Sequence, residues 1–478
     1  MRVMKRNPWL AGLGMVIAAL VVSGGPARAD VTTDRPGSII FFPKVISTPP
    51  GIAGVPARDT VIQISTRSNL RTTAHCFYVN AIGLCSTTVN QQCELDTDCP
   101  VTSLPGVIPA VHESCVRACS EQDFDIFLTA QQPTWWLVSR GRSLGDPIYT
   151  GFPPNATGIH ALLPQGDFEG QLTCVETDPL TGDPWNGNDL RGIATVINSG
   201  SVNPDSTYSS VNVISTGLTT DNDLNFTGSC DPSTGVCTGE YNACPATLLL
   251  NHFADGATDP FLSDQCVVTA TPTVPCSAAS PAGSCSCTTS AAPCTAASGC
   301  PLVNVVNTEL TLMPCTQNIP NYSGPPGPPF GTPVNLDLAI FNELEQKLTG
   351  KIIFDCWFNR RLSDITFSGT NLTLASLLTP FAATRISPVA GSACLTGART
   401  GLPCTHSDPT DPTNGCPGSF SSADGTDLGC RPWSGVVGVA EEFHALNAGG
   451  VPVPGVAGAD AYNLHIEGAR SGDILVVP

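Results

Sequence analysis

VIQISTRSNLRTTAHCFYVN, residues 61–80, is the stretch that decides the fold of this chain. Apolar and polar residues alternate at its start, a polar turn follows, and a second apolar run carries Cys76 ahead of two aromatic residues. Side chains two apart on a strand share a face, so this alternation is typical of strands that bury one side. Residues 61–80 therefore predict two strands joined by a polar turn.

Short apolar or alternating runs between turn residues continue outward from this stretch along the whole chain. The 478 residues include 46 glycines and 43 prolines, and little of the sequence has helical periodicity. This pattern indicates many short strands and few helices, so we predict an all-β fold of sandwich or barrel type. The predicted strands are residues 38–42, 60–64, 74–79, 123–128, 171–175, 192–197, 310–313, 336–341, 351–358, 436–440 and 462–466.

Four local patterns occur twice, in the same order, along the chain. The pairs are Ile39–Pro43 with Leu310–Pro314, residues 61–80 with 336–359, Asp125-Ile126 with Asp364-Ile365, and Gly170–Glu176 with Gly435–Glu441. The shared order predicts two tandem β-sandwich domains, residues 30–225 and 301–478, separated by a Cys-rich connecting region, 226–300. The alternative is one large β domain built of unrelated strands.

Three segments of the first half carry a family resemblance. Residues 59–80, 168–176 and 191–198 are similar to immunoglobulin-like modules of secreted bacterial proteins. The resemblance implies two tandem immunoglobulin-like β-sandwich domains with disulfide-rich loop insertions. It covers only part of the chain and rests on packing motifs, so it implies no catalytic residues.

The first 29 residues have the pattern of a signal peptide. A basic start leads into an apolar run, residues 9–22, and the small-residue pattern Ala27-Arg28-Ala29 precedes Asp30. This order predicts export and cleavage, although an apolar run at the N-terminus can also be a membrane anchor. No later window has the length and apolar character of a membrane span. We therefore predict an extracytoplasmic protein that is secreted, periplasmic or held at the cell surface.

The 22 cysteines favour the same compartment. They cluster in strand-poor stretches, with five in residues 85–119, six in 266–300 and four in 394–430, and Cys-x2-Cys zinc pairs are absent. Even numbers of cysteines in an exported chain predict disulfides, which would hold these stretches as stapled insertions. Inside apolar strands, Cys76, Cys174 and Cys356 are candidates for bridges between sheets or for buried thiols. The disulfide candidates are Cys76, Cys174, Cys315 and Cys356.

The charge of the chain argues against polyanionic partners. Without residues 1–29 the chain keeps 17 basic and 40 acidic side chains, a net charge of −23. Such a surface repels phosphate backbones and anionic lipids, so we predict no nucleic-acid binding.

A Gly-x-Ser-x-Gly string around Ser143 is the first candidate for chemistry. In hydrolases this string forms a sharp turn from a strand into a helix, and His160 and Asp167 lie downstream as possible partners. Prolines follow Ser143 closely and prevent such a helix, which favours a loop. A serine hydrolase is therefore an alternative rather than the main prediction.

The second candidate is a metal site of Glu442, His444, His465 and Glu467. Residues two apart on a strand point to one face, so each segment presents a carboxylate and an imidazole together. If the two strands pair, four ligands converge. Ordinary salt-bridged histidines at a solvated edge are the alternative.

The third candidate is structural calcium, the one cofactor that the sequence suggests. Asp221, Asp223 and Asn225 have the spacing of the first ligands of a calcium loop but lack its later Gly and Glu. The oxygen-rich stretch 178–189 is similar, although Asp and Asn also form ordinary turns.

No catalytic signature outweighs its structural alternative. We therefore predict a secreted or cell-surface structural or binding protein without catalytic activity, whose partner is an extracellular ligand or an envelope component. The alternatives are a secreted metal-dependent or serine hydrolase and a calcium-stabilised component of an envelope or extracellular layer.

Overall fold

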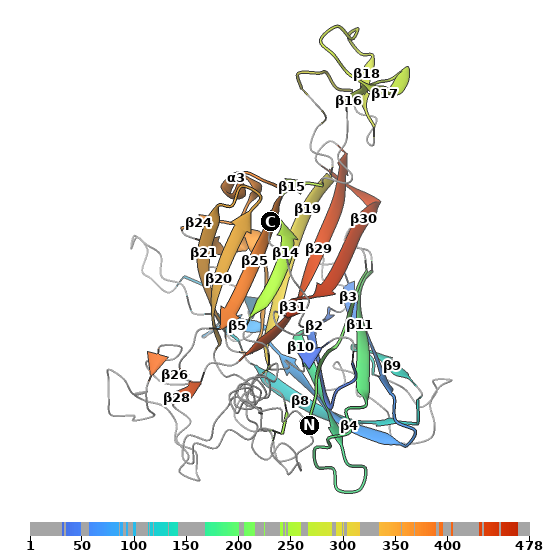
Figure 1. The fold of residues 1–478 in the computed structure, drawn as a ribbon, viewed down its shortest axis with the longest axis vertical. Coiled ribbons are helices and arrows are strands. Elements are labelled where there is room, and N and C mark those ends of the chain that lie inside the picture. The colour runs from blue at the N-terminus through green and yellow to red at the C-terminus, as the bar shows by residue number, and fades with distance from the viewer. Residues whose placement is uncertain are drawn as a thin grey trace, which may run out of the picture.

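The computed structural model describes most of residues 31–48, 57–101, 113–141, 168–215, 240–315, 334–394 and 430–466, with short gaps inside these ranges, and also Leu224 and Pro403–Cys404. The described chain is almost entirely β-structure, and the pairings between its strands are antiparallel. One helix of a single turn, α3 (Leu374–Leu377), and a short 3-10 turn, η2 (Leu362–Asp364), are the exceptions within these ranges. The prediction of an all-β fold is confirmed (Figure 1).

The first half of the chain forms two sheets that pack face to face, which we call the first sheet pair. Its six-stranded sheet has the order β1-β13-β2-β10-β4-β8, and its four-stranded sheet has the order β12-β11-β3-β9. Alternating side chains from both sheets, among them Phe42, Tyr78 and Trp136, fill a common core. The strands are β1 (Val31–Thr32), β2 (Ile39–Ser47), β3 (Ala57–Thr66), β4 (Thr72–Asn80), β8 (Ser120–Leu128), β9 (Thr134–Leu137), β10 (Phe168–Thr177), β11 (Leu190–Ser199), β12 (Ser206–Ser209) and β13 (Val211–Val213).

The second half forms another two packed sheets, the second sheet pair. One has the order β21-β20-β25-β14-β31, and the other has the order β15-β19-β29-β30 with β22 also paired to β19. Leu250, Leu312 and Leu338 lie in the core between them. The strands are β14 (Leu248–Phe253), β15 (Ala257–Thr258), β19 (Asn304–Pro314), β20 (Val334–Asn342), β21 (Lys347–Phe354), β22 (Phe358–Arg361), β25 (Phe381–Pro388), β29 (Val436–Ala448), β30 (Val451–Asn463) and β31 (His465–Ile466). The hairpin β23 (Thr366–Phe367) and β24 (Thr370–Asn371) lies beside β21.

Strands β14 and β15 belong to the region that the sequence analysis treated as a connector. Both lie within residues 226–300, yet β14 is a central strand of its sheet, paired with β25 and β31. The apolar run of β14, Leu248-Leu249-Leu250, is short and stands between Cys-rich stretches, so it was not predicted as a strand.

A third core joins the two sheet pairs. It contains Ile39, Phe41 and Phe77 from the first pair and Met313, Trp357 and Val437 from the second. The indole Nε1 of Trp357 donates a hydrogen bond to the Pro43 carbonyl at 2.6 Å, and Gln171 Nε2 donates one to the Cys356 carbonyl at 3.1 Å. Because both partners contribute to one apolar cluster, the two sheet pairs pack as one body.

The disulfide described between strands of the first sheet pair lies within one sheet. Cys76 on β4 bonds to Cys174 on β10, and these residues are direct cross-strand partners with Cα atoms 4.0 Å apart. The expected bridge between sheets is therefore a bridge within one sheet. Cys356 bonds to Cys119, which links the second half of the chain to the first, and Cys315 bonds to Cys244.

The two halves share some features of the predicted repeat and differ in others. Strand β2 pairs with β10 as β19 pairs with β29, which agrees with two of the repeated patterns. The chain passes from one sheet to the other between β3 and β4, whereas β20 and β21 are neighbours in one sheet. The tandem repeat thus remains a prediction.

Each Cys-rich insertion contains a small three-stranded sheet. The insertion at 85–119 holds β6-β5-β7, and the insertion at 394–430 holds β27-β26-β28 together with residues next to it. Their strands are β5 (Gly83–Cys85), β6 (Gln92–Cys93), β7 (Cys115–Arg117), β26 (Ser392–Cys394), β27 (Pro403–Cys404) and β28 (Cys430–Pro432).

The third insertion, residues 266–300, is called the knob from here on. It holds β17-β16-β18, formed by β16 (Cys266–Val268), β17 (Thr271–Pro275) and β18 (Cys285–Cys287). Figure 1 shows the knob apart from the sheets, beyond one end of β29 and β30. In the described part of the chain, no helix has the length and apolar character to cross a membrane.

Candidate functional site

The predicted metal ligands divide between two different sheets. Glu442 and His444 lie on β29, whose partners are β19 and β30. His465 begins β31, which pairs with β14 in the facing sheet. The strand pairing that would have gathered the four ligands is therefore not formed. Only the backbone of His465 is described, and Glu467 lies outside the described residues, so the four-ligand site remains a prediction.

His444 instead meets a carboxylate that the sequence analysis did not consider. Its Nδ1 lies 2.6 Å from Oδ2 of Asp259, a buried residue that follows β15. On the same strand, Glu442 accepts a hydrogen bond from the Tyr462 hydroxyl at 3.3 Å, and burial raises the pKa of the Glu442 carboxyl. The hydrogen-bonded pair of His444 and Asp259 connects β29 to the segment that leads into the knob.

The serine and calcium candidates fall where the structure gives no description. Ser143, His160 and Asp167 lie outside the described residues, as do Asp221, Asp223 and Asn225.

The other oxygen-rich stretch, 178–189, is described, and it forms a turn. Asp178 Oδ1 accepts the backbone N–H groups of Leu180 and Thr181 at 2.7 and 3.2 Å. This is the local use of an Asp side chain that competes with calcium binding in such sequences. Beside the turn, the buried carboxylate of Glu176 accepts the backbone N–H of Asp189 at 3.1 Å.

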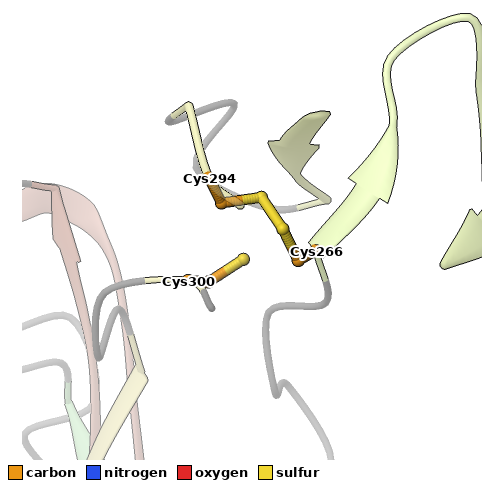
Figure 2. Close-up of side chains that lie close together, drawn as sticks. All are labelled: Cys266, Cys294 and Cys300. Atoms are coloured by element: carbon orange, nitrogen blue, oxygen red, sulfur yellow. A yellow bond between two sulfur atoms is a disulfide. The ribbon is translucent and has the colours of Figure 1, made fainter. Parts of the chain in front are cut away.

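The knob brings together three cysteines whose sulfur atoms have the spacing of a metal site. The sulfur atoms of Cys266, Cys294 and Cys300 lie within 4.8 Å of one another. Figure 2 shows the three side chains close together. However, Cys266 bonds to Cys294, and Cys300 bonds to Cys287. Metals bind thiolates, which these oxidised sulfurs no longer offer. The cluster therefore consists of two structural disulfides. The bond between Cys276 and Cys285 is a third crosslink in the knob.

The knob also differs chemically from the rest of the chain. Residues 266–300 contain no Asp, Glu, Lys, Arg or His, whereas the whole chain has a formal net charge of −19. Most of the side chains are Ser, Thr, Ala, Pro or Val, and Val274 is an exposed apolar residue on β17. The knob therefore presents an uncharged surface of hydroxyl and small apolar groups.

A cluster of charged side chains lies where the two sheet pairs meet. Lys44 on β2 belongs to the first pair, and Glu309 on β19 and Glu441 on β29 belong to the second. Glu309 and Glu441 are direct cross-strand partners, so both carboxylates lie on one face of their sheet. The Lys44 ammonium contacts both of them.

Water is nearly excluded from this cluster. The exposed fractions of the Lys44, Glu441 and Glu309 side chains are 1%, 1% and 15%. The Phe443 ring lies near the Lys44 Nζ, with its centroid at 5.8 Å, and the Lys44 backbone is hydrogen-bonded to the Tyr208 hydroxyl. The lysine is thus fixed at its backbone as well as at its charged end.

The surroundings shift the pKa values of Lys44 and Glu309 in opposite directions. Burial lowers the pKa of the Lys44 amine, but the two carboxylates raise it more, so the pKa lies above its ordinary value. Burial raises the pKa of the Glu309 carboxyl, yet Lys44, with Arg58 and Asn359, holds that pKa at about 2. Glu309 is therefore firmly ionised. A buried ammonium between two carboxylates can hold the two sheet pairs together by charge attraction. It also places an amine and a carboxyl group where they could react with each other.

Sequence reasoning missed this cluster, although a signal was present. Lys44 is one of three lysines after residue 29, and it stands inside the apolar run IIFFPKVI. Glu309 and Glu441 also interrupt apolar strands. A charged residue in a buried strand needs a partner, but the partners here lie 265 and 397 residues away in sequence. Searches for relatives add no further guide, because no family model matches the chain and no curated protein is significantly similar to it.

Proposed function

We propose that this chain is an exported, non-catalytic binding or structural protein of the cell surface or extracellular space, and that the knob is its contact end. One observation carries the proposal: a small domain closed by three disulfides projects from a body made of two sheet pairs with a shared core. Loops held rigidly on a β scaffold are a common way to present a contact surface.

Export is part of the proposal and is supported by the disulfides. Seven disulfides are formed among the described residues, and such bonds persist in oxidising compartments. The basic, apolar and small-residue segments of residues 1–29 agree with this. We also propose that each sheet pair is an immunoglobulin-like module, as the sequence resemblance implies.

The composition of the knob supports a contact role over a purely structural one. A loop of this length with few large apolar residues buries too little apolar surface to offset the entropy it loses on ordering, so disulfides must constrain it. Three crosslinks within residues 266–300 hold the knob in one shape, as a fixed contact surface requires. Because the knob is uncharged, it can approach an anionic envelope that repels the acidic body.

Deleting the knob tests this proposal. The full chain and a variant with residues 266–300 replaced by a short Gly-Ser linker are produced in the same cells, and the surface-retained fraction is measured by antibody labelling. A variant with the insertion at 394–430 replaced in the same way is the matched control. We expect the knob variant to be released into the medium while the control stays bound. Equal retention of both variants would refute the contact role.

The non-catalytic part has its own test. The purified chain is assayed on ester, glycoside and peptide substrates, with and without a chelator. Turnover that co-purifies with the chain would show that it is an enzyme.

A further inference from the structure

The charged cluster between the sheet pairs contains an amine and a carboxyl group in direct contact and out of water. Lys44 Nζ contacts Glu441, whose side chain is buried and whose second oxygen, Oε1, has no hydrogen-bond partner among the described residues. A buried carboxylate oxygen without a partner is costly, because its hydration is lost and nothing replaces it. The site is therefore poorly satisfied as a permanent ion pair.

The two carboxylates around Lys44 are not equivalent. Burial raises the pKa of Glu309, but Lys44, and to a smaller extent Arg58 and Asn359, lower it further and keep Glu309 ionised. Glu441 has Lys44 as its hydrogen-bond partner and is completely buried. A pair of carboxyl groups in such different surroundings is suited to different roles, one as a proton acceptor and one as a reacting group.

We propose that Lys44 and Glu441 become joined by an amide bond, formed within the folded protein, that links the first sheet pair covalently to the second. The proposal does not depend on the contact role of the knob. It assigns to this cluster a covalent modification that needs no other enzyme.

The chemistry balances without any co-reactant. A proton first passes from the Lys44 ammonium to the Glu441 carboxylate, which gives a neutral amine and a carboxylic acid. The lone pair of Nζ then attacks Cδ of Glu441, and the ionised Glu309 takes a proton from the nitrogen. Glu309 returns this proton to the departing hydroxyl, the C–O bond breaks, and one water molecule leaves. The products are a secondary amide, water and the original Glu309 carboxylate.

Burial and positioning favour each of these steps. The raised pKa of Lys44 makes the ion pair the resting form. Burial disfavours charged groups, so the pair of neutral amine and neutral acid, through which the reaction passes, is a minor form in equilibrium with the ion pair. Groups held in contact by a fold react as if at effective concentrations of about 10⁵–10⁸ M. After reaction, the unsatisfied carboxylate charge of Glu441 is gone, and Glu309 remains beside Arg58.

The bond would complement the disulfide that already joins the two halves. Cys119–Cys356 is lost under reducing conditions, whereas an amide between residues 44 and 441 survives them. The junction of the sheet pairs would then have one reducible and one permanent crosslink.

Mass spectrometry of the wild-type protein decides the question. The purified protein is fully reduced, alkylated and denatured before its intact mass is measured. We expect a mass lower than that of the sequence by one water molecule. Trypsin should fail to cleave after Lys44, and the peptide that contains Lys44 should be joined to the one that contains Glu441.

Two variants serve as matched controls. Lys44→Arg keeps the positive charge but lacks the reactive amine, and Glu309→Gln removes the proton acceptor. Both should keep the full mass, and both should migrate more slowly than the wild type on a reducing denaturing gel, because the chain is no longer closed into a loop. Wild-type protein that keeps its full mass after prolonged incubation at neutral pH overturns the proposal. A water loss that persists in Lys44→Arg overturns it as well.

Discussion

The imidazole of His252 should make the second sheet pair sensitive to acid. His252 lies on β14, is fully buried, and its Nε2 is 2.7 Å from the hydroxyl of Thr384 on β25. Burial lowers the pKa of this imidazole to about 4 from the ordinary value of 6.5. In the folded state the ring is therefore neutral at any pH well above 4, whereas in the unfolded chain it takes up a proton near pH 6.5.

The size of the effect follows from the difference between these two pKa values. Because the folded-state pKa is depressed, the contribution to stability is complete above pH 6.5 and is lost as the pH falls toward 4. A difference of this size corresponds to about 3 kcal/mol, at roughly 1.4 kcal/mol for each pH unit. Below pH 4 this group contributes no further change.

The assay compares pH slopes rather than absolute stabilities. The free energy of unfolding is measured by urea denaturation, with disulfides intact, from pH 7 to pH 4 for the wild type and for His252→Leu. The loss of the hydrogen bond to Thr384 shifts the variant at every pH, so it cancels from the slope. We expect the wild type to lose about 3 kcal/mol more than the variant over this range.

A second variant isolates the titrating ring from its partner. Thr384→Val removes the hydroxyl but leaves the buried imidazole, so its pH slope should match that of the wild type. Equal slopes for wild type and His252→Leu would refute the reasoning, since they would mean that the ring is protonated or solvated in the folded protein.

Three further predictions concern the junction and one buried acid. Trp357→Ala should lower the free energy of unfolding by about 3–5 kcal/mol and shift a single calorimetric transition, because the Trp357 side chain lies in the core shared by both sheet pairs; two separate transitions would contradict this. The double variant Cys119→Ser/Cys356→Ser should cost about 2–5 kcal/mol, whereas loss of one disulfide inside the knob should leave the main transition unchanged in a thermal melt. Burial raises the pKa of Glu176 to about 8, so the unfolding free energy should fall as the pH rises from 4.5 to 8, and Glu176→Gln should flatten that part of the pH profile; an unchanged slope would show that the carboxylate is hydrated.

Strand positions could be predicted well from the sequence because the burial pattern has a short period. Residues 38–42, 171–175 and 336–341 were predicted as strands, and except for Ser38 they lie in β2, β10 and β20. The predicted strand 351–358 is different, since β21 ends at Phe354 and β22 starts at Phe358 in the other sheet of the pair. Trp357, in the turn between β21 and β22, is buried in the core that the two sheet pairs share. The sequence therefore stays apolar where the strand ends.

Partners of strands and cysteines could not be predicted in the same way. Cys76 and Cys174 each lie in an apolar strand, and the sequence indicates only that both are buried. Whether they meet across one sheet or between two sheets depends on the strand order, which is set by the packing of the whole chain. The same limit explains why Glu442 and His444 were expected to meet His465, while the structure places Asp259 beside His444.

The charged cluster shows which buried contacts can and cannot be predicted from one sequence. Lys44, Glu309 and Glu441 each interrupt an apolar strand, and a buried charge is tolerated when an opposite charge or a set of hydrogen bonds compensates it. The sequence therefore indicates that each needs a partner, but it does not identify which of the 40 acidic side chains meet the lysine. Only the pairing of Glu309 with Glu441 across β19 and β29 shows that two carboxylates share one amine. That buried contact between an amine and a carboxylate with one unpartnered oxygen is the physical reason to look for a covalent bond there.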